Sequence, residues 1–164
     1  MYVVGVDPGV ARTGYGVVVA QGDRWGAVSY GSIVSEAREP LSRRLRTIYD
    51  ELTAVLDASP VDGMAVEELF LAKNPRMALS VGHARGVVLL LAEQRGIPVF
   101  EYAVTEIKRA VVGNGAASKE QVRYMVSKLL GLGHVPQAYD AADALAVALC
   151  HLQRTARNPM RTSG

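Results

Sequence analysis

The chain is poor in cysteine and in the larger aromatic residues: its 164 residues include one cysteine, one tryptophan and two phenylalanines. Cys150 cannot form an internal disulfide, and no group of Cys and His residues has the spacing of a zinc site. The amino terminus lacks the basic segment of a secretory signal, and apolar runs such as 87–92 are far too short to span a bilayer. We therefore expect a cytoplasmic protein with no membrane segment and no disulfide framework.

A strong net charge is also absent. The formal charge is +2 and the pI is near 8.8, which hints at a polyanionic partner without establishing one. No acidic residue occurs between Glu68 and Glu93, however, and a second basic group follows further along the chain. The first stretch contains Lys73, Arg76, His83 and Arg85, and the second group is Lys108, Arg109, Lys119, Arg123 and Lys128. Both groups are suited to phosphate contacts, although a solvated helix face explains Arg123 and Lys128 equally well.

The composition is typical of one globular domain, with 49% hydrophobic and 21% charged residues. The sequence contains no internal repeat. Residues 155–164 have little apolar content, so we expect a folded domain over residues 1–154 followed by a flexible tail over 155–164.

Hydrophobic periodicity predicts strands first and helices afterwards. Short Val-rich segments between turn residues predict three antiparallel strands, and apolar positions at helical spacing then predict helices that alternate with two further strands. The expected strands are Tyr2–Asp7, Gly14–Ala20, Trp25–Val34, Met64–Glu67 and Ile97–Tyr102, and the expected helices are Pro40–Ser59, Pro75–Gln94, Val104–Val112, Ser118–Leu132 and Gln137–Arg154. Strands joined through helices pair in parallel, so this order predicts an α/β fold. Its sheet should be mixed and five-stranded, with three antiparallel strands and then two parallel ones, flanked by helices on both faces.

Four carboxylates stand out against this pattern. Asp7 and Glu67 each end an otherwise apolar strand, where a charge costs free energy unless a cation or hydrogen bonds compensate it. Asp140 and Asp143 are three residues apart near the start of the last helix, so they share a face, with about 5 to 6 Å between their β-carbons. If that helix packs over the ends of both strands, the four acids converge on an oxygen-rich site suited to Mg²⁺ or Mn²⁺.

Each acid also has a purely structural explanation. Asp7 precedes Pro8 and Gly9 and so fits a turn, and Asp140 in a first helical turn would complement the helix dipole. Glu68 adjoins Glu67 and composition cannot separate the two, although alternation along a strand puts them on opposite faces. The metal-site prediction therefore requires all four side chains to meet in space.

Several short motifs, taken in order, are more specific than any one of them. Asp7-Pro8-Gly9 is followed by Thr13-Gly14-Tyr15-Gly16. Later motifs are 66–74 (VEELFLAKN), 84–87 (ARGV), 99–102 (VFEY), 107–108 (IK) with 111–113 (VVG), 118–119 (SK) and 140–146 (DAADALA). In this order and spacing they resemble the RuvC family of Holliday-junction resolvases over residues 1–153. Tyr139 departs from the family pattern by adding a residue just before the last acidic pair, which removes no acid.

The resemblance implies a ribonuclease H-like fold and structure-selective cleavage of four-way DNA junctions in recombination and repair. The catalytic and metal-binding residues would be Asp7, Glu67, Asp140 and Asp143. They would hold two Mg²⁺ ions per subunit, replaceable by Mn²⁺, that activate water and stabilise the leaving 3′ oxygen, giving paired nicks with 5′-phosphate ends. Contacts to DNA are expected from Phe70, Lys73, Arg76, Lys108 and Lys119. Phe70 resembles a family aromatic that wedges against bases, although a lone Phe is more often a core residue.

A dimer is expected because four-way junctions have approximate two-fold symmetry, which suits one active site for each of two opposed strands. Ala78, Gly82 and Gly86 form a small-residue ridge at spacing i, i+4, i+8 on the predicted helix 75–94. The spacing alone fits close packing inside one subunit as well as a dimer interface, and the resemblance favours the dimer. It also implies the branch-migration proteins RuvA and RuvB as partners, although no residue shows such a contact.

Two other classes of protein fit parts of the pattern. A ribonuclease H-like nuclease acting on RNA, of the YqgF type, would share the first acid and a late acidic helix. It is not expected to carry the segment from Phe70 to Lys73 or the basic block 108–119. A non-catalytic junction-binding module, or an actin-like nucleotide binder built on the turn after Asp7, would not cleave DNA. The actin-like protein needs a second domain, for which the chain has little room.

Overall fold

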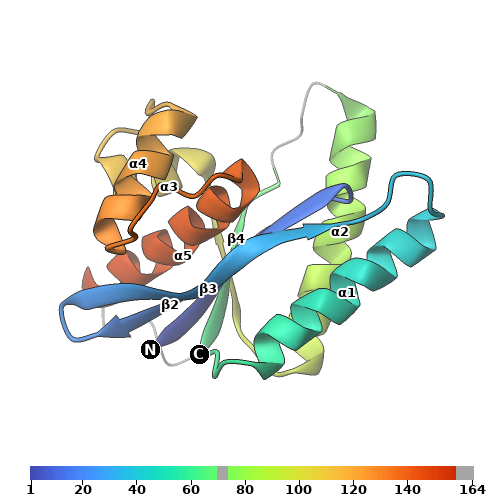
Figure 1. The fold of residues 1–164 in the computed structure, drawn as a ribbon, viewed down its shortest axis with the longest axis horizontal. Helices are drawn as coiled ribbons and strands as arrows, with labels where there is room; N and C mark the ends of the chain where they lie inside the picture. The colour runs from blue at the N-terminus through green and yellow to red at the C-terminus, as the bar shows by residue number, and fades with distance from the viewer. Residues whose placement is uncertain (70–73, 158–164) are drawn as a thin grey trace.

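The structure is a computed structural model that describes residues 1–69 and 74–157, which form one sheet covered by helices on both faces (Figure 1). The strands are β1 (Tyr2–Asp7), β2 (Arg12–Gln21), β3 (Arg24–Val34), β4 (Gly63–Glu67) and β5 (Val99–Tyr102). The helices are α1 (Leu41–Asp57), α2 (Pro75–Gln94), α3 (Val104–Val112), α4 (Lys119–Leu129) and α5 (Tyr139–Arg157). None of the helices in these ranges is long and apolar enough to cross a membrane.

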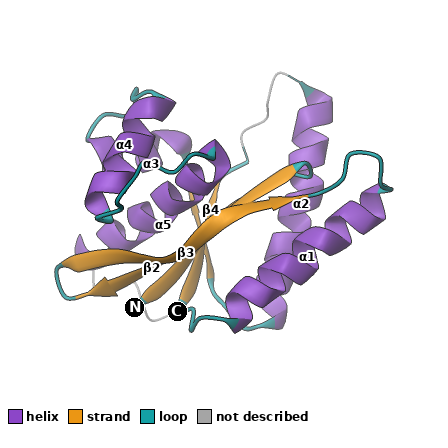
Figure 2. Ribbon diagram, viewed as in Figure 1, coloured by secondary structure: helices purple, strands orange, loops and turns teal. Residues whose placement is uncertain are grey.

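The sheet is mixed, as the order of elements predicts. Its strand order is β3-β2-β1-β4-β5. β1 pairs antiparallel with β2, and β2 with β3, whereas β4 pairs parallel with β1 and β5 parallel with β4. β1 therefore lies at the centre, between the antiparallel and the parallel half of the sheet. Figure 2 shows the strands in orange, between the two groups of helices.

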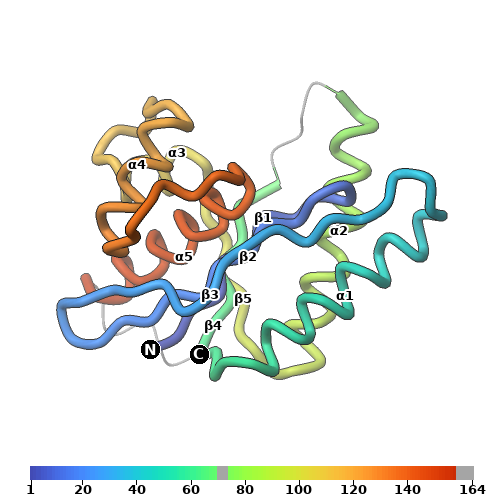
Figure 3. The backbone as a smooth tube through the Cα atoms, viewed as in Figure 1, coloured from blue at the N-terminus to red at the C-terminus, as the bar shows by residue number. Residues whose placement is uncertain are grey.

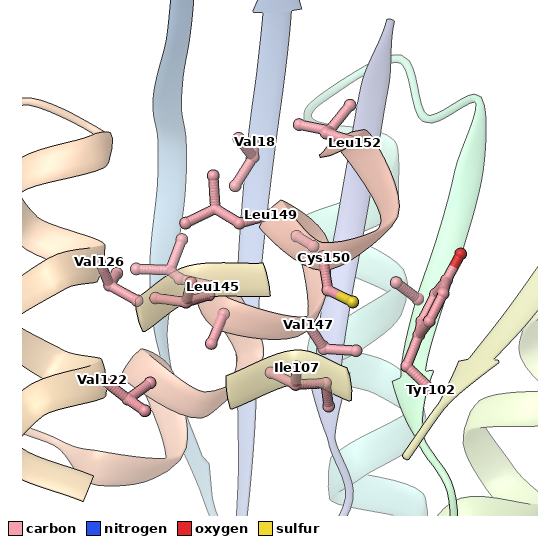
Figure 4. Close-up of a cluster of buried hydrophobic side chains, with 14 of the residues drawn as sticks. Val18, Tyr102, Ile107, Val122, Val126, Leu145, Val147, Leu149, Cys150 and Leu152 are labelled. Carbon is pink, nitrogen blue, oxygen red and sulfur yellow. The ribbon is translucent and has the colours of Figure 1, made fainter. Parts of the chain in front are cut away.

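The two faces of the sheet bury separate cores. α3, α4 and α5 cover one face and α1 and α2 cover the other (Figure 3). Successive side chains of a strand point to opposite faces, so Val3 of β1 belongs to the core under α5, whereas Val4 and Val6 pack towards α1 and α2. α5 lies between the sheet and the helices α3 and α4, and its Leu145, Val147 and Leu149 belong to the buried cluster in Figure 4. Every residue from Ala144 to Leu152 is buried. The long apolar run in this helix is thus explained by burial on two sides.

Glycines allow α5 to lie directly against the backbone of β1 and β2. A β-carbon added to Gly5 would lie 1.8 Å from the carbonyl oxygen of Ala144, and one added to Gly14 would lie 1.9 Å from that of Asp140. At Gly16 it would lie 2.6 Å from a methyl group of Leu145. Because real β-carbons do not approach other atoms so closely, only glycine fits at these positions, and the three glycines form a track that seats the helix.

The helix and strand bounds differ from the predicted ones by a few residues, with local reasons. Pro40 caps α1 instead of starting it, and β5 begins after Pro98, which has no N–H to donate to the sheet. α4 ends before Gly131, whose φ of +61° lies in the left-handed region. α5 continues to Arg157, so residues 155–157 of the predicted tail are helical. The rest of the predicted tail lies outside the described residues.

Candidate active site

Asp7 and Glu67 lie next to each other at the ends of adjacent strands. Val6 pairs with Val66 in the parallel ladder, and the two acids are the residues that follow. Val3 and Ala65 point to the α5 side of the sheet, and Asp7 and Glu67 follow them at even spacing. Both carboxylates therefore project towards the face that α5 covers.

The first turn of α5 brings Asp140 and Asp143 to the same place. Gly14 pairs with Asp7 across the β1–β2 ladder, and the carbonyl of Asp140 rests against Gly14. The helix thus begins over the residue opposite Asp7, and its first turn carries the two acids three residues apart. All four acids, although remote in sequence, thus lie at the same end of the sheet.

Asp7, Glu67 and Asp143 line a cavity of about 310 Å³. Two lysines, Lys108 of α3 and Lys119 of α4, line it as well. The rest of its wall is apolar and consists of Val104, Ile107, Val122 and Ala146. A larger cavity of about 680 Å³ lies along β5 and contains none of the four acids, so the chemistry of the lining, and not its size, selects the smaller one.

The surroundings of Asp7 and Glu67 disfavour the charged forms of their carboxylates. The pKa of Asp7 is raised from 3.8 to about 7, first by burial and then by the charges of Asp143, Glu67 and Asp140 in that order, against the opposing effect of Lys119. Burial also raises the pKa of Glu67, with Asp143 adding to the effect and Lys119 and Lys108 opposing it. A cluster of this kind has a strong electrostatic preference for a bound cation.

Lys119 forms an ion pair with one of the acids of the cavity. Ser118 is the N-cap of α4, since its hydroxyl accepts a hydrogen bond from the Gln121 N–H at 3.1 Å, and Lys119 is therefore the first residue of the helix. Its Nζ lies 3.5 Å from a carboxylate oxygen of Asp143. Burial raises the pKa of Asp143, and Lys119 opposes that rise.

The two carboxylate oxygens of Asp140 differ in their partners. Oδ1 forms an ion pair with Nε of Arg12 at 3.6 Å, whereas Oδ2 is buried and accepts no hydrogen bond from any described residue. Among the described residues, no three acidic, His or Cys side chains form a ready-made ligand set; Arg12 and Lys119 pair with the two acids of α5 instead. The donor chemistry fits a hard divalent ion, because all four side chains offer carboxylate oxygens and one of these is buried and unpartnered.

The predicted DNA contacts fall in different places. Lys108 and Lys119 lie in the cavity itself. Arg76 is exposed in the first turn of α2, outside the cavity lining. Phe70 and Lys73 lie outside the described residues.

The two glycines of the small-residue ridge on α2 have open space beside them. A β-carbon added to Gly82 or Gly86 would meet no atom of residues 1–69 or 74–157 within 4 Å. Ala78 and Gly82 are partly exposed, Gly86 is exposed, and Met77, Leu79 and Leu90 on the same helix are more than half exposed. Close packing within one chain, one of the two explanations of the spacing, is therefore excluded for the two glycines.

Sequence reasoning missed Arg12 and left Arg123 ambiguous between a phosphate contact and a solvated face. Nε and Nη2 of Arg123 both donate to the carbonyl of Pro136, at 3.0 and 2.7 Å, and the guanidinium lies 4.3 Å from the centre of the Tyr139 ring. Arg123 thus holds the segment that leads into α5, and the unusual Tyr139 provides the ring against which it stacks. The partners are separated by a loop, so no spacing in the sequence signals these contacts.

The sheet order and the packing of α5 against β1 and β2 define a protein of the ribonuclease H-like class, with an acidic cavity at one end of the sheet. A sequence profile of the family described as "Crossover junction endodeoxyribonuclease RuvC" matches residues 3–151. The chain is 49% identical over 152 residues to the crossover junction endodeoxyribonuclease RuvC of Syntrophomonas wolfei, which covers 93% of this chain and 88% of that protein. The chain therefore belongs to the RuvC family.

Solved structures agree in fold. The structure described as "T. thermophilus RuvC in complex with Holliday junction substrate" matches with a TM-score of 0.88 at 36% identity and covers 93% of each chain. A second Thermus thermophilus RuvC structure matches with a TM-score of 0.86 at 36% identity and covers 96% of each chain. The predicted ribonuclease H-like fold is confirmed, and the family favours the resolvase interpretation over the RNA-directed and actin-like alternatives.

Proposed function

We propose that this protein is a magnesium-dependent endonuclease that resolves four-way DNA junctions by paired, symmetric nicks. Its family and the likeness to a relative solved with a Holliday junction support the substrate. The observation that carries the chemistry is the single cavity in which Asp7, Glu67 and Asp143 face Lys108 and Lys119. Acids that can hold cations, beside lysines that can hold a phosphate, suit metal-assisted phosphodiester hydrolysis.

In this proposal Asp7 is the central ligand, because it is the acid on which the charges of the other three act. Glu67 approaches it from β4, and Asp140 and Asp143 approach from α5. Two divalent ions bound by these oxygens would activate the attacking water and stabilise the leaving 3′ oxygen, and Mn²⁺ should replace Mg²⁺. Oδ2 of Asp140 offers a ligand atom that has no hydrogen-bond partner among residues 1–69 and 74–157.

The lysines have a second role once cations neutralise the acids. Without metal, Lys119 pairs with Asp143, and its charge lowers the pKa of three of the four acids. When a cation takes over that task, the ammonium groups of Lys119 and Lys108 become available to the phosphate of the scissile strand. Phe70, Lys73 and Arg76 are proposed to contact the DNA further from the cleaved bond.

We propose that two copies associate through α2. The ridge of Ala78, Gly82 and Gly86 is open to a partner, and the exposed Met77, Leu79 and Leu90 give the same helix an apolar surface. A two-fold dimer would present one site to each of two opposed strands. RuvA and RuvB are proposed as partners on family grounds alone.

The test uses a synthetic four-way junction and the matching linear duplex, with protein in Mg²⁺ or in chelator. Native protein should nick the junction at symmetric positions only with metal and should leave the duplex intact. Asp7→Asn should bind the junction and fail to cut it, whereas Asp23→Asn, an exposed change in the turn between β2 and β3, should cut normally. Cleavage that persists in Asp7→Asn would overturn the mechanism, and absence of junction binding by native protein would overturn the substrate. Binding should weaken steeply as salt is raised, because phosphate contacts release counterions.

A further inference from the structure

Arg85, in the middle of α2, is the only lysine or arginine among the described residues that is buried, with 8% of its surface exposed. Burying a guanidinium is costly unless its N–H groups find acceptors, so its partners decide its role. Ala84 and Val88 on the same helix are fully buried, and α2 therefore holds this arginine against the sheet.

The guanidinium joins the ends of two strands. Nη1 donates a hydrogen bond to the backbone carbonyl of Glu67 at 2.7 Å, and Nη2 forms an ion pair with Oε1 of Glu101 at 2.5 Å. Glu67 is the last residue of β4, and Glu101 lies on β5 beside Val66. One side chain from α2 thus ties both strands where β4 leaves the sheet.

Glu67 lies where the pairing of β4 becomes one-sided. β4 still pairs with β5 at Glu67 and Tyr102, whereas its pairing with β1 ends at Val66, so the carbonyl of Glu67 lies beyond the β1 ladder. On the β5 side, the Glu68 N–H donates to the carbonyl of Tyr102 at 2.9 Å. In the described part of the chain, the peptide after Glu67 is thus held by this backbone bond and by Arg85.

Arg85 acts on the backbone of Glu67 and not on its carboxylate. The cations that lower the pKa of Glu67 are Lys119 and Lys108, both of which line the acidic cavity, and Arg85 is absent from that lining. Removing the arginine would leave the charge of the cavity in place and would free the peptide that aims the carboxylate.

We propose that Arg85 is a positioning residue for the acidic site, which fixes the direction of the Glu67 side chain by holding the Glu67 carbonyl. This inference rests on the proposed function, in which Glu67 helps to bind divalent ions. Since α2 is also the helix proposed to form the dimer, the same hydrogen bond connects Glu67 to that interface.

The test compares Arg85→Lys with Glu101→Gln. Lysine keeps the charge and can satisfy Glu101, but its single ammonium lacks the planar fork that bonds both partners. Glu101→Gln removes the ion pair and leaves the bond from Nη1 to Glu67 intact, so it is the matched control for lost stability. Arg85→Met, similar in length and without a donor, is a second variant with the same expectation if the lysine variant does not fold.

Three quantities are measured for each variant: Mn²⁺ affinity without DNA by EPR spectroscopy, single-turnover cleavage of a four-way junction, and urea unfolding. Arg85→Lys should weaken Mn²⁺ binding and slow cleavage by roughly 10-fold or more, the usual effect of losing a residue that orients a metal ligand. Glu101→Gln should keep both within about 3-fold of native even where it unfolds more easily.

The role is overturned if Arg85→Lys and Arg85→Met bind Mn²⁺ as tightly as native protein, or if Glu101→Gln loses as much affinity as they do. Failure of the proposed function has a different signature. Native protein would then bind Mn²⁺ and leave the junction uncut, while the comparison of Mn²⁺ affinities would still decide the role of Arg85.

Discussion

Replacing Asp7 by asparagine tests the electrostatic description of the site in metal-free protein. Burial and three neighbouring carboxylates raise the pKa of Asp7 from 3.8 to about 7 in the folded state. In the unfolded chain the residue loses its proton near the ordinary value, so between the two values the folded state binds more protons. The contribution of Asp7 to the free energy of unfolding is therefore most favourable at acidic pH and declines as the pH rises towards 7.

Asparagine carries no charge at any pH, so Asp7→Asn avoids this decline. At about 1.4 kcal/mol for each pH unit between the two pKa values, the native protein should lose at most about 4 kcal/mol relative to the variant. The difference in the free energy of unfolding should be near zero at about pH 4 and reach its full size above about pH 7.

The assay is urea unfolding in chelator across this pH range at constant ionic strength. Asp23→Asn, at the opposite end of the sheet, is the control for loss of a surface carboxylate and should change stability little at any pH. Adding Mg²⁺ at about pH 8 should stabilise native protein more than Asp7→Asn, because the ion binds only the folded state and needs the ionised acid. A stability difference that is constant with pH, or a variant less stable than native at high pH, would refute the reasoning.

Three further predictions follow from the packing and charges of the site. Gly14→Ala should destabilise the protein by about 1–3 kcal/mol in urea unfolding and slow junction cleavage, because the new methyl group meets the Asp140 carbonyl. Gly26→Ala is the control, since the nearest neighbour of its new β-carbon would be Val19 at 3.9 Å. Equal effects of the two substitutions would contradict the packing of α5 against Gly14. Lys119→Met should move the acidic limb of the pH–rate profile for junction cleavage to higher pH, because loss of this cation lets the pKa values of Asp7, Glu67 and Asp143 rise further. If the acidic limb stays at the same pH, Lys119 does not act on these acids. Gly82→Trp should preserve the fold and weaken self-association in sedimentation experiments, because a β-carbon at that position would meet nothing within 4 Å in the described part of the chain. A native protein that is monomeric throughout would rule out the proposed dimer.

The order and type of the strands and helices could be predicted because each has a strong local signal. The Val-rich strands alternate between two buried faces, and the apolar positions of α1 recur at helical spacing, so period and burial agree. Asp7 and Glu67 stand out as acids for the same reason, since each ends an apolar strand. Pairing of these strands then places the two acids together.

The long-range contacts could not be predicted, because they depend on how separate elements meet. Nothing near Asp140 in the sequence points to Arg12, and the bond between Arg85 and the carbonyl of Glu67 joins a side chain to a backbone atom of another element. Gly14 could be recognised as part of a family motif, but its contact with Asp140 requires the three-dimensional path of α5. The spacing of small residues on α2 fits an exposed surface as well as internal packing, and only the three-dimensional structure distinguishes the two.

The position of α5 in chain order has a consequence for biosynthesis. Asp140 and Asp143 lie on α5, the last described helix, and α5 packs against glycines of β1 and β2. The four acids can therefore assemble only after α5 has left the ribosome and packed onto the sheet. A nascent chain that has completed β1 to β5 carries Asp7 and Glu67 without their counterparts and is expected to be inert towards DNA. The chain is thus expected to gain the ability to cleave DNA only at the end of its synthesis, because α5 is encoded last among the described elements. An incomplete chain then needs no inhibitor to prevent cleavage.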